Sequence, residues 1–187
     1  KDISLPSEER SLKMYPMDFE EFCDALNEKK MIEYIRKCYK DKTALEDNLH
    51  HKAMLLFKQY MLVGGMPQAV NAYLDSNNLA VVDAVKREII ELYADDFRKI
   101  DPKGKATRLF YAIPGQLNKN ASRYQISSVI GQGKQDRLEA LIQDMEDSQV
   151  VLLSHHANDP NVGLPLHEDS DRYKMFMNDT GLFVTLA

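Results

Sequence analysis

The sequence predicts a mostly α-helical fold: a helical bundle followed by a winged helix-turn-helix-like unit, with a short β segment at the N-terminus. Apolar residues recur at steps of three and four over most of residues 17–148, as they do on one face of a helix. Two short β-like runs, 150–153 and 173–177, follow the last of these helices. The composition, 44% hydrophobic and 28% charged, is ordinary for a globular protein.

The first fifteen residues carry a short apolar alternation. Ile3 and Leu5 precede a turn that contains Pro6, and Leu12 and Met14 follow it. This pattern predicts two small strands in a hairpin. So small a hairpin needs other structure to pack on, and nothing obvious in this chain supplies a sheet for it.

Residues 16–101 are predicted to form a helical domain. Its helices are expected at 17–26, 31–39, 44–63, 67–74 and 79–97. Thr43 followed by Glu46 predicts a capping box at the start of the third helix. Asn77 or Asn78 is expected to cap the fifth. The Pro/Gly pair in 101–104 marks the boundary of this domain.

The turn between the third and fourth helices is the most distinctive stretch of the chain. Gly64 and Gly65 can adopt backbone angles that other residues avoid. Pro67 has no amide proton, which suits the first turn of a new helix. Gly64, Gly65, Met66 and Pro67 are therefore predicted to form a helix stop, a tight turn and a helix start, and they are a candidate hinge. The linker at 101–104 is the alternative hinge.

Residues 102–187 are predicted to form the winged-helix-like domain, with helices at 108–116, 124–130 and 136–148 before the two strands. Pro114 is expected to bend or end the first of them. Such a fold can place its third helix in the DNA major groove, but here that helix is acidic. Nucleic-acid binding is an alternative that we do not favour over packing against another domain. The candidate nucleic-acid contacts are Lys103, Lys105, Arg108, Lys119 and Arg123.

No residue pattern predicts a catalytic, cofactor-binding or metal-binding site. The stretch 131–134, Gly-Gln-Gly-Lys, lacks the second half of a phosphate-binding loop. His155, His156 and His167 lie near several acids, but their spacing matches no familiar metal site, and a solvated acidic loop is the favoured interpretation. A freestanding enzyme remains a third hypothesis, which a deep pocket with converging polar groups would support.

The charge and the cysteine content suggest the compartment. The net charge of −5 argues mildly against a protein that wraps nucleic acid. No apolar run approaches the roughly 20 residues that span a membrane, and the start does not resemble a signal peptide. Cys23 and Cys38 are expected to be reduced thiols. These features predict a cytoplasmic protein without a membrane partner.

Four stretches, taken in order, resemble one family. They are 12–22 (LKMYPMDFEEF), 60–70 (YMLVGGMPQAV), 113–117 (IPGQL) and 173–182 (YKMFMNDTGL). Together they resemble the predicted AAA+ superfamily P-loop ATPases of bacteria and archaea that carry a C-terminal domain of unknown function. The resemblance covers nearly the whole chain, and its signature residues here are Gly64, Gly65, Met66 and Pro67.

The resemblance implies that this chain is the part that follows the nucleotide-binding core of a larger ATPase. Residues 1–15 would then be remnant strands of that core, and ATP and Mg would belong to the missing N-terminal P-loop domain. The implied partners are that P-loop domain and a C-terminal nuclease-like domain. No Walker motif is present and no catalytic residue of the family maps onto this chain. The implied function is therefore regulatory: transmission of the nucleotide state to a partner or a further domain.

Overall fold

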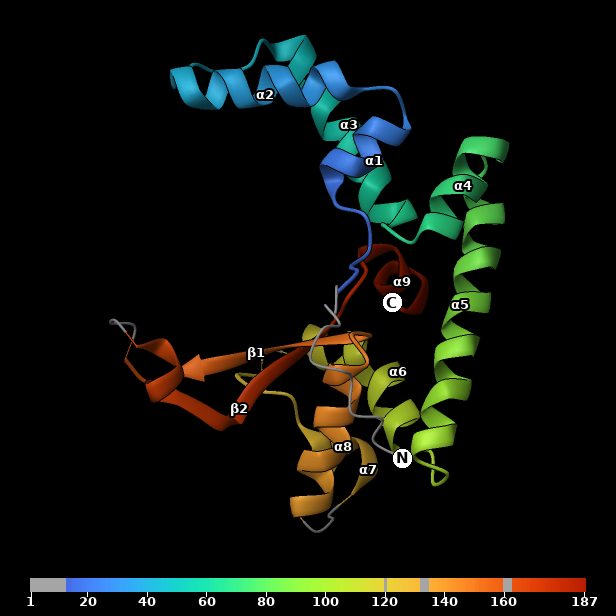
Figure 1. The fold of residues 1–187 in the computed structure, drawn as a ribbon, viewed down its shortest axis with the longest axis vertical. Coiled ribbons are helices and arrows are strands. Elements are labelled where there is room, and N and C mark those ends of the chain that lie inside the picture. Colours follow the sequence, from blue (N-terminus) through green and yellow to red (C-terminus); the bar gives the residue numbers. More distant parts are fainter. Residues whose placement is uncertain (1–12, 120, 132–134, 160–162) are drawn as a thin grey trace, which may run out of the picture.

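The computed structural model describes residues 13–119, 121–131, 135–159 and 163–187. It is mostly α-helical with a small antiparallel sheet, which confirms the predicted fold class. Two lobes are joined along one side by the long helix α5 (Leu79–Ile100) (Figure 1). The predicted strands at 1–12 lie outside the described residues, and 13–18 form neither helix nor strand.

The first lobe is built from four helices, of which α3 and α4 pack against α5. They are α1 (Phe19–Ala25), α2 (Lys29–Asp41), α3 (Asp47–Val63) and α4 (Pro67–Ser76). Its core consists of two clusters. One contains Phe22, Val63, Ala69, Val70 and Val82, and the other contains Cys23, Met31, Ile32 and Leu56. Both cysteines are free and buried.

The helix starts only partly follow the prediction. Asn78 caps α5, because its side-chain oxygen accepts from the Ala80 N–H at 2.9 Å, as expected. The capping box predicted at Thr43 and Glu46 is wrong: α3 begins at Asp47, and its N-cap Glu46 makes no side-chain hydrogen bond. The helix that does carry a capping box is α1, at Asp18 and Glu21.

The second lobe holds three helices and a two-stranded antiparallel ribbon. They are α6 (Lys105–Asn118), α7 (Ile126–Ile130), α8 (Gln135–Asp147), β1 (Val151–Ala157) and β2 (Glu168–Met177), with a 3-10 turn η1 (Leu164–His167) between the strands. Val151 faces Met177 and His155 faces Tyr173, with a break in register after His155. This order of helices and strands is the one expected, and the assignment to the winged-helix fold stays a prediction.

Pro114 does not end α6, which continues to Asn118. A proline inside a helix removes one backbone hydrogen bond. Here the proline ring is buried with Leu109, Phe110 and Ile113 on the core side of the helix, so packing of this face compensates for the lost bond.

The core continues across the predicted boundary between 16–101 and 102–187. Ile90 and Phe97 of α5 belong to the same buried cluster as Leu109 and Phe110 of α6. The turn between the two helices is also ordered by hydrogen bonds. The Asp101 carboxylate accepts from the backbone N–H groups of Lys103, Lys105 and Ala106.

The last helix, α9 (Thr180–Leu186), was not predicted, because seven residues are too few to show a periodic pattern. It contacts α3, α5 and α6, and it lies where the two lobes meet (Figure 1). Leu182 is its buried anchor, at 2% exposure.

Replacing Asp101 with alanine should lower the free energy of unfolding by about 1 kcal/mol, because the first turn of α6 would lose its side-chain cap. Urea denaturation measures the change. Lys103→Ala is the matched control in the same turn, since this side chain is exposed and should change stability by less than about 0.5 kcal/mol. Equal stability of Asp101→Ala and the wild type would contradict the capping role.

Candidate functional site: an interlobe junction

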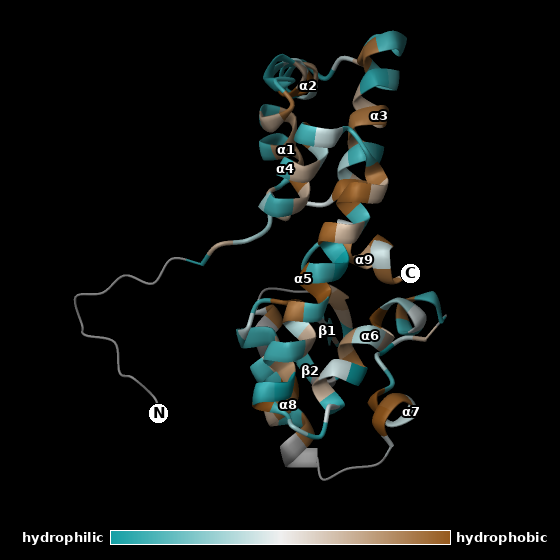
Figure 2. Cartoon of the chain, turned by 90° about the vertical axis from the view of Figure 1, so that its right-hand side faces the viewer, coloured by the Kyte–Doolittle hydropathy of each residue, from teal (hydrophilic) through white to brown (hydrophobic). Residues whose placement is uncertain are grey.

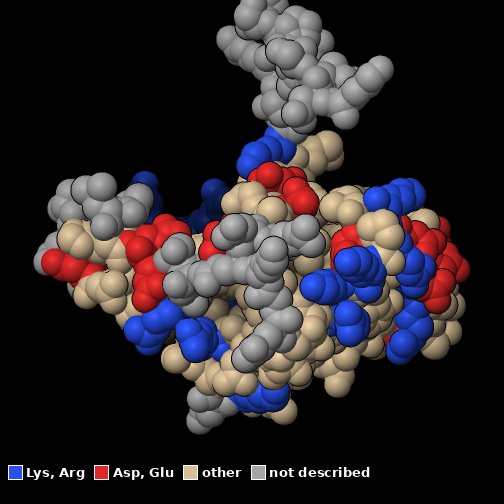
Figure 3. Space-filling view, turned by 90° about the horizontal axis from the view of Figure 1, so that it is seen from below, with Lys and Arg blue, Asp and Glu red and all other residues tan. Residues whose placement is uncertain are grey.

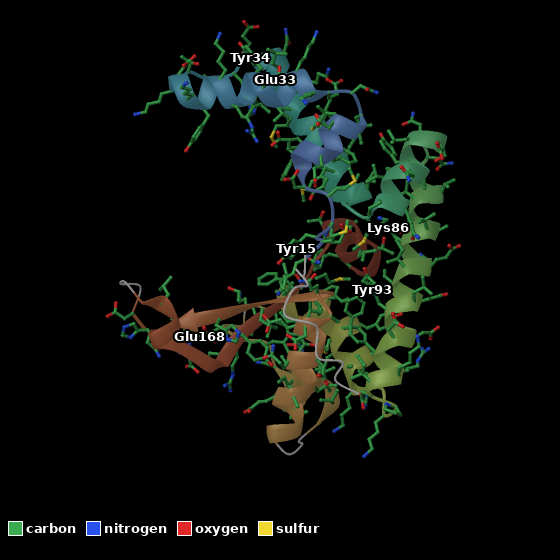
Figure 4. The ribbon with its side chains drawn as sticks, viewed as in Figure 1. Tyr15, Glu33, Tyr34, Lys86, Tyr93 and Glu168 are labelled. Atoms are coloured by element: carbon green, nitrogen blue, oxygen red, sulfur yellow. The ribbon has the colours of Figure 1, made fainter. Side chains whose placement is uncertain are left out.

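Three segments far apart in the sequence meet where the lobes and α9 join. They are Met17 ahead of α1, the Gly64–Gly65 turn between α3 and α4, and Asp179–Gly181 at the start of α9. Lys86 reaches the same place from α5 (Figure 4). We call these residues the interlobe junction.

Two of the glycines let backbones approach each other directly. A Cβ added at Gly65 would lie 2.0 Å from the Met17 carbonyl oxygen, and one added at Gly181 would lie 2.3 Å from the Val63 carbonyl oxygen. Neither distance is possible for a real side chain, and the obstructing atoms are backbone atoms that cannot rotate away. The Met17 N–H also donates to the Gly65 carbonyl at 2.7 Å.

The carboxylate of Asp179 fastens α9 to the glycine turn. One oxygen accepts from the Gly65 N–H at 2.6 Å, and the other accepts from the Leu182 N–H at 2.8 Å. Asp179 is 3% exposed, so these bonds are shielded from water. Gly64 has φ of +86°, and a Cβ there would lie 2.3 Å from the Asp179 carboxylate, so both its backbone angle and its surroundings favour glycine.

Lys86 holds the end of α3 against the first turn of α9. Its ammonium group donates to the carbonyl of Leu62 at 2.7 Å and to the carbonyl of Gly181 at 3.2 Å. Its side chain is 4% exposed, which is rare for lysine unless the charge is satisfied. The Lys86 ammonium group therefore connects the end of α3 to the start of α9.

Burial sets the ionisation of both charged groups. Burial raises the pKa of Asp179 above its usual value, against the opposing effects of backbone N–H donors and the charge of Lys86. Burial likewise lowers the pKa of Lys86, against the carboxylates of Asp83 and Asp179. Both shifts favour the neutral forms, as expected in an environment of low dielectric.

Polar side chains support the junction from α3 and α5. The Tyr60 hydroxyl donates to the Met17 carbonyl at 3.0 Å. Burial raises the pKa of Tyr60, and the Asp179 carboxylate adds to the shift. On the far side of α9, the Thr185 hydroxyl donates to the Asp83 carboxylate at 2.9 Å.

The arrangement joins chain segments and offers no reactive pair of side chains. Both carboxylate oxygens of Asp179 already accept from backbone N–H groups, and Lys86 donates to two carbonyls. Of the predicted signature, Gly64 and Gly65 form the contact itself and Pro67 is the first residue of α4. Met66 packs against the cores of both lobes. The hinge role of these four residues stays a prediction.

The five candidate nucleic-acid contacts fall into two groups. Lys103, Lys105 and Arg108 lie at the start of α6, while Lys119 and Arg123 follow its other end. A helix of this length separates the groups by about 20 Å. Figure 3 shows Lys and Arg in several groups on this side of the molecule, with acidic side chains beside them.

The solvent side of α8 is acidic. A DNA-binding winged-helix domain would place this helix in the major groove. The exposed residues of α8 include Glu139, Asp144 and Asp147. Carboxylates in that position repel phosphates, so the geometry gives little support to DNA recognition by this helix.

In the part of the chain that the structure describes, no group of three or more His, Cys, Asp or Glu is placed so that it could hold a metal ion. His155 Nδ1 instead lies 3.2 Å from a carboxylate oxygen of Glu168 on the neighbouring strand.

A protein-family model described as a domain of unknown function, DUF8612, matches residues 54–187. The chain belongs to the DUF8612 family. The matched part includes the glycine turn, Lys86 and the start of α9, whereas Met17 lies ahead of it. No curated protein and no solved structure matches this DUF8612 chain.

Among its described residues, every helix is too short or too polar to cross a membrane.

Replacing Gly65 with alanine should destabilise the protein by several kcal/mol, because the new methyl group would collide with the Met17 backbone. Gly115→Ala is the matched control: Gly115 lies inside α6 with open space around its Cβ position, and alanine there should raise stability by up to about 1 kcal/mol. Chemical denaturation of both variants gives the comparison. The same effect at both positions would show that the close approach of Met17 does not exclude a side chain at position 65.

The Asp179→Asn variant should reveal the ionisation of the junction. Because the folded pKa of Asp179 is raised, its contribution to stability is fully present below its unfolded pKa near 3.8 and is lost as the pH rises through the folded pKa. The stability of the wild type minus that of Asp179→Asn should therefore fall as the pH rises from about 3.8 and then level off. Unfolding free energies between about pH 3 and 7 test this. A difference that rises with pH would mean that the folded pKa is lowered.

Proposed function

We propose that this DUF8612 chain is the regulatory helical and winged-helix-like part of an AAA+-type ATPase in the cytoplasm, and that it is not catalytic by itself. In this proposal it passes the nucleotide state of a P-loop domain to a partner or to a further, nuclease-like domain. ATP and Mg would be bound by the P-loop domain and not by the residues described above.

The observation that supports this role most is the series of hydrogen bonds through the junction. The segment ahead of α1 bonds to the glycine turn through Met17, and the same glycine bonds to the cap of α9 through Asp179. The contacts at Gly65 and Gly181 leave no slack between the backbones. A displacement of residues 13–18 would therefore move α4 and α9 instead of being absorbed locally.

Most of the stretches that resemble AAA+-type ATPases contribute a residue to the junction. Three of the four stretches that carry it, 12–22, 60–70 and 173–182, contribute Met17, Gly65 and Asp179 to one contact. The nucleic-acid-binding module has less support, since its candidate residues lie in two groups and α8 is acidic.

The first test is calorimetry of this chain with ATP and magnesium, for which we expect no binding heat. Binding at micromolar affinity would contradict the placement of the chain outside the ATPase core.

The second test uses the intact natural protein that contains this chain. Spin labels at Glu33→Cys and Lys174→Cys, with Cys23 and Cys38 replaced by alanine, report the distance between the lobes, since both labelled positions are exposed. We expect the distance distribution to change when ATP is added, and Asp179→Asn to weaken the change. The same distribution with and without ATP, or the lack of a P-loop domain in the natural protein, would overturn the proposal.

A further inference from the structure

Helix α3 is apolar on two opposite sides, and only one of them is buried. Leu56 and Val63 face the core. The other side carries five apolar residues, each 40–48% exposed: Met54, Leu55, Phe57, Met61 and Leu62. We call this side, with the exposed residues His50, His51 and Lys58 interspersed, the outer face of α3. Figure 2 shows hydrophobic stretches along this helix.

The five residues form one continuous surface. At 100° per residue, positions 54, 55, 57, 61 and 62 fall within an arc of about 160° around the helix axis. Scattered apolar residues on a protein surface need no explanation, whereas a continuous apolar surface marks an interaction site.

The charge on this face is of one sign. Lys58 is the one permanently charged residue of the outer face between positions 50 and 62. The other lysine of α3, Lys52, is paired with Glu28 at 2.7 Å. The acidic residue of the helix, Asp47, is its first residue and lies about 10 Å before Met54.

We propose that the outer face of α3 is a docking surface for an amphipathic helix of a partner protein, apolar along one side and acidic next to it. The apolar side would cover the five exposed residues, as helices do when they pack side by side. The acidic residues would face Lys58 and the two histidines. Met54 and Met61 are flexible side chains that adapt to a partner surface.

A second copy of this chain fits the face less well. In a symmetric antiparallel pair of α3 helices, Lys58 would lie near its own copy, because it is close to the middle of the face. Like charges placed together at an interface are unfavourable.

A partner bound to the outer face of α3 would lie next to the junction. The carbonyl of Leu62, the last residue of the outer face, accepts the hydrogen bond from Lys86 at 2.7 Å. The docking surface itself does not depend on the ATPase proposal, and its test uses this chain alone.

The test uses two synthetic helical peptides of about 18 residues, five turns, with leucine along one side and either glutamate or lysine along the other. Fluorescence anisotropy should show the glutamate peptide binding about tenfold or more tightly than the lysine peptide. The double variant Leu55→Gln, Met61→Gln should lose about tenfold or more in affinity. Lys58→Glu should remove or reverse the preference between the peptides.

Leu92→Gln is the matched control, because Leu92 is 59% exposed but lies on α5. This variant should bind like the wild type, and thermal unfolding confirms that all variants are folded. The proposal is overturned by any of four results: no binding, equal binding of both peptides, equal loss in the Leu92→Gln control, or a dimer in sedimentation that the double variant abolishes. Binding to phosphatidylglycerol vesicles in preference to the glutamate peptide would also overturn it.

Discussion

The buried carboxylate of Asp179 accepts from two backbone N–H groups that are far apart in the sequence, and the joining of the two lobes depends on it. Gly65 and Asp179 are 114 positions apart. Their contact needs a glycine at positions 64, 65 and 181, since a Cβ at 65 or 181 would collide with backbone atoms and one at 64 would collide with the Asp179 carboxylate. Lys86 then fastens the carbonyls that the same contact brings together.

The hydrogen bonds of the junction supply tertiary contacts that helix α9 needs. Helix α9 has seven residues, too few to be stable without tertiary contacts. One carboxyl group can both cap α9 and hold the glycine turn, because each of its two oxygens accepts from a different backbone N–H. Burial opposes the charged forms of Asp179 and Lys86. A buried polar group that loses its hydrogen-bond partner typically costs about 1 to 3 kcal/mol. The three segments are therefore joined as a unit.

The sequence predicted the parts of the fold whose signal is local and long. The apolar stripe of α5, the stop at Gly64 and the start at Pro67 were confirmed within a few residues. The predicted N-terminus of α3 was wrong, because Thr43 and Glu46 match the sequence pattern of a capping box but do not form one. The roles of Asp179 and Lys86 could not be predicted, since their partners are backbone groups of distant segments. The Gly-Gly pair predicted a turn, and the close approach of Met17 to it was not predicted.

Hydrogen exchange of the backbone amides of Gly65 and Leu182, followed by NMR, tests most directly whether the junction joins the lobes. Both amides donate to Asp179 in a buried site, so their opening free energies should lie close to that of global unfolding. The amides of the exposed residues Lys13, Met14 and Tyr15 provide the fast reference. Exchange of Gly65 and Leu182 as fast as that reference would show that the junction opens freely and does not hold the molecule together.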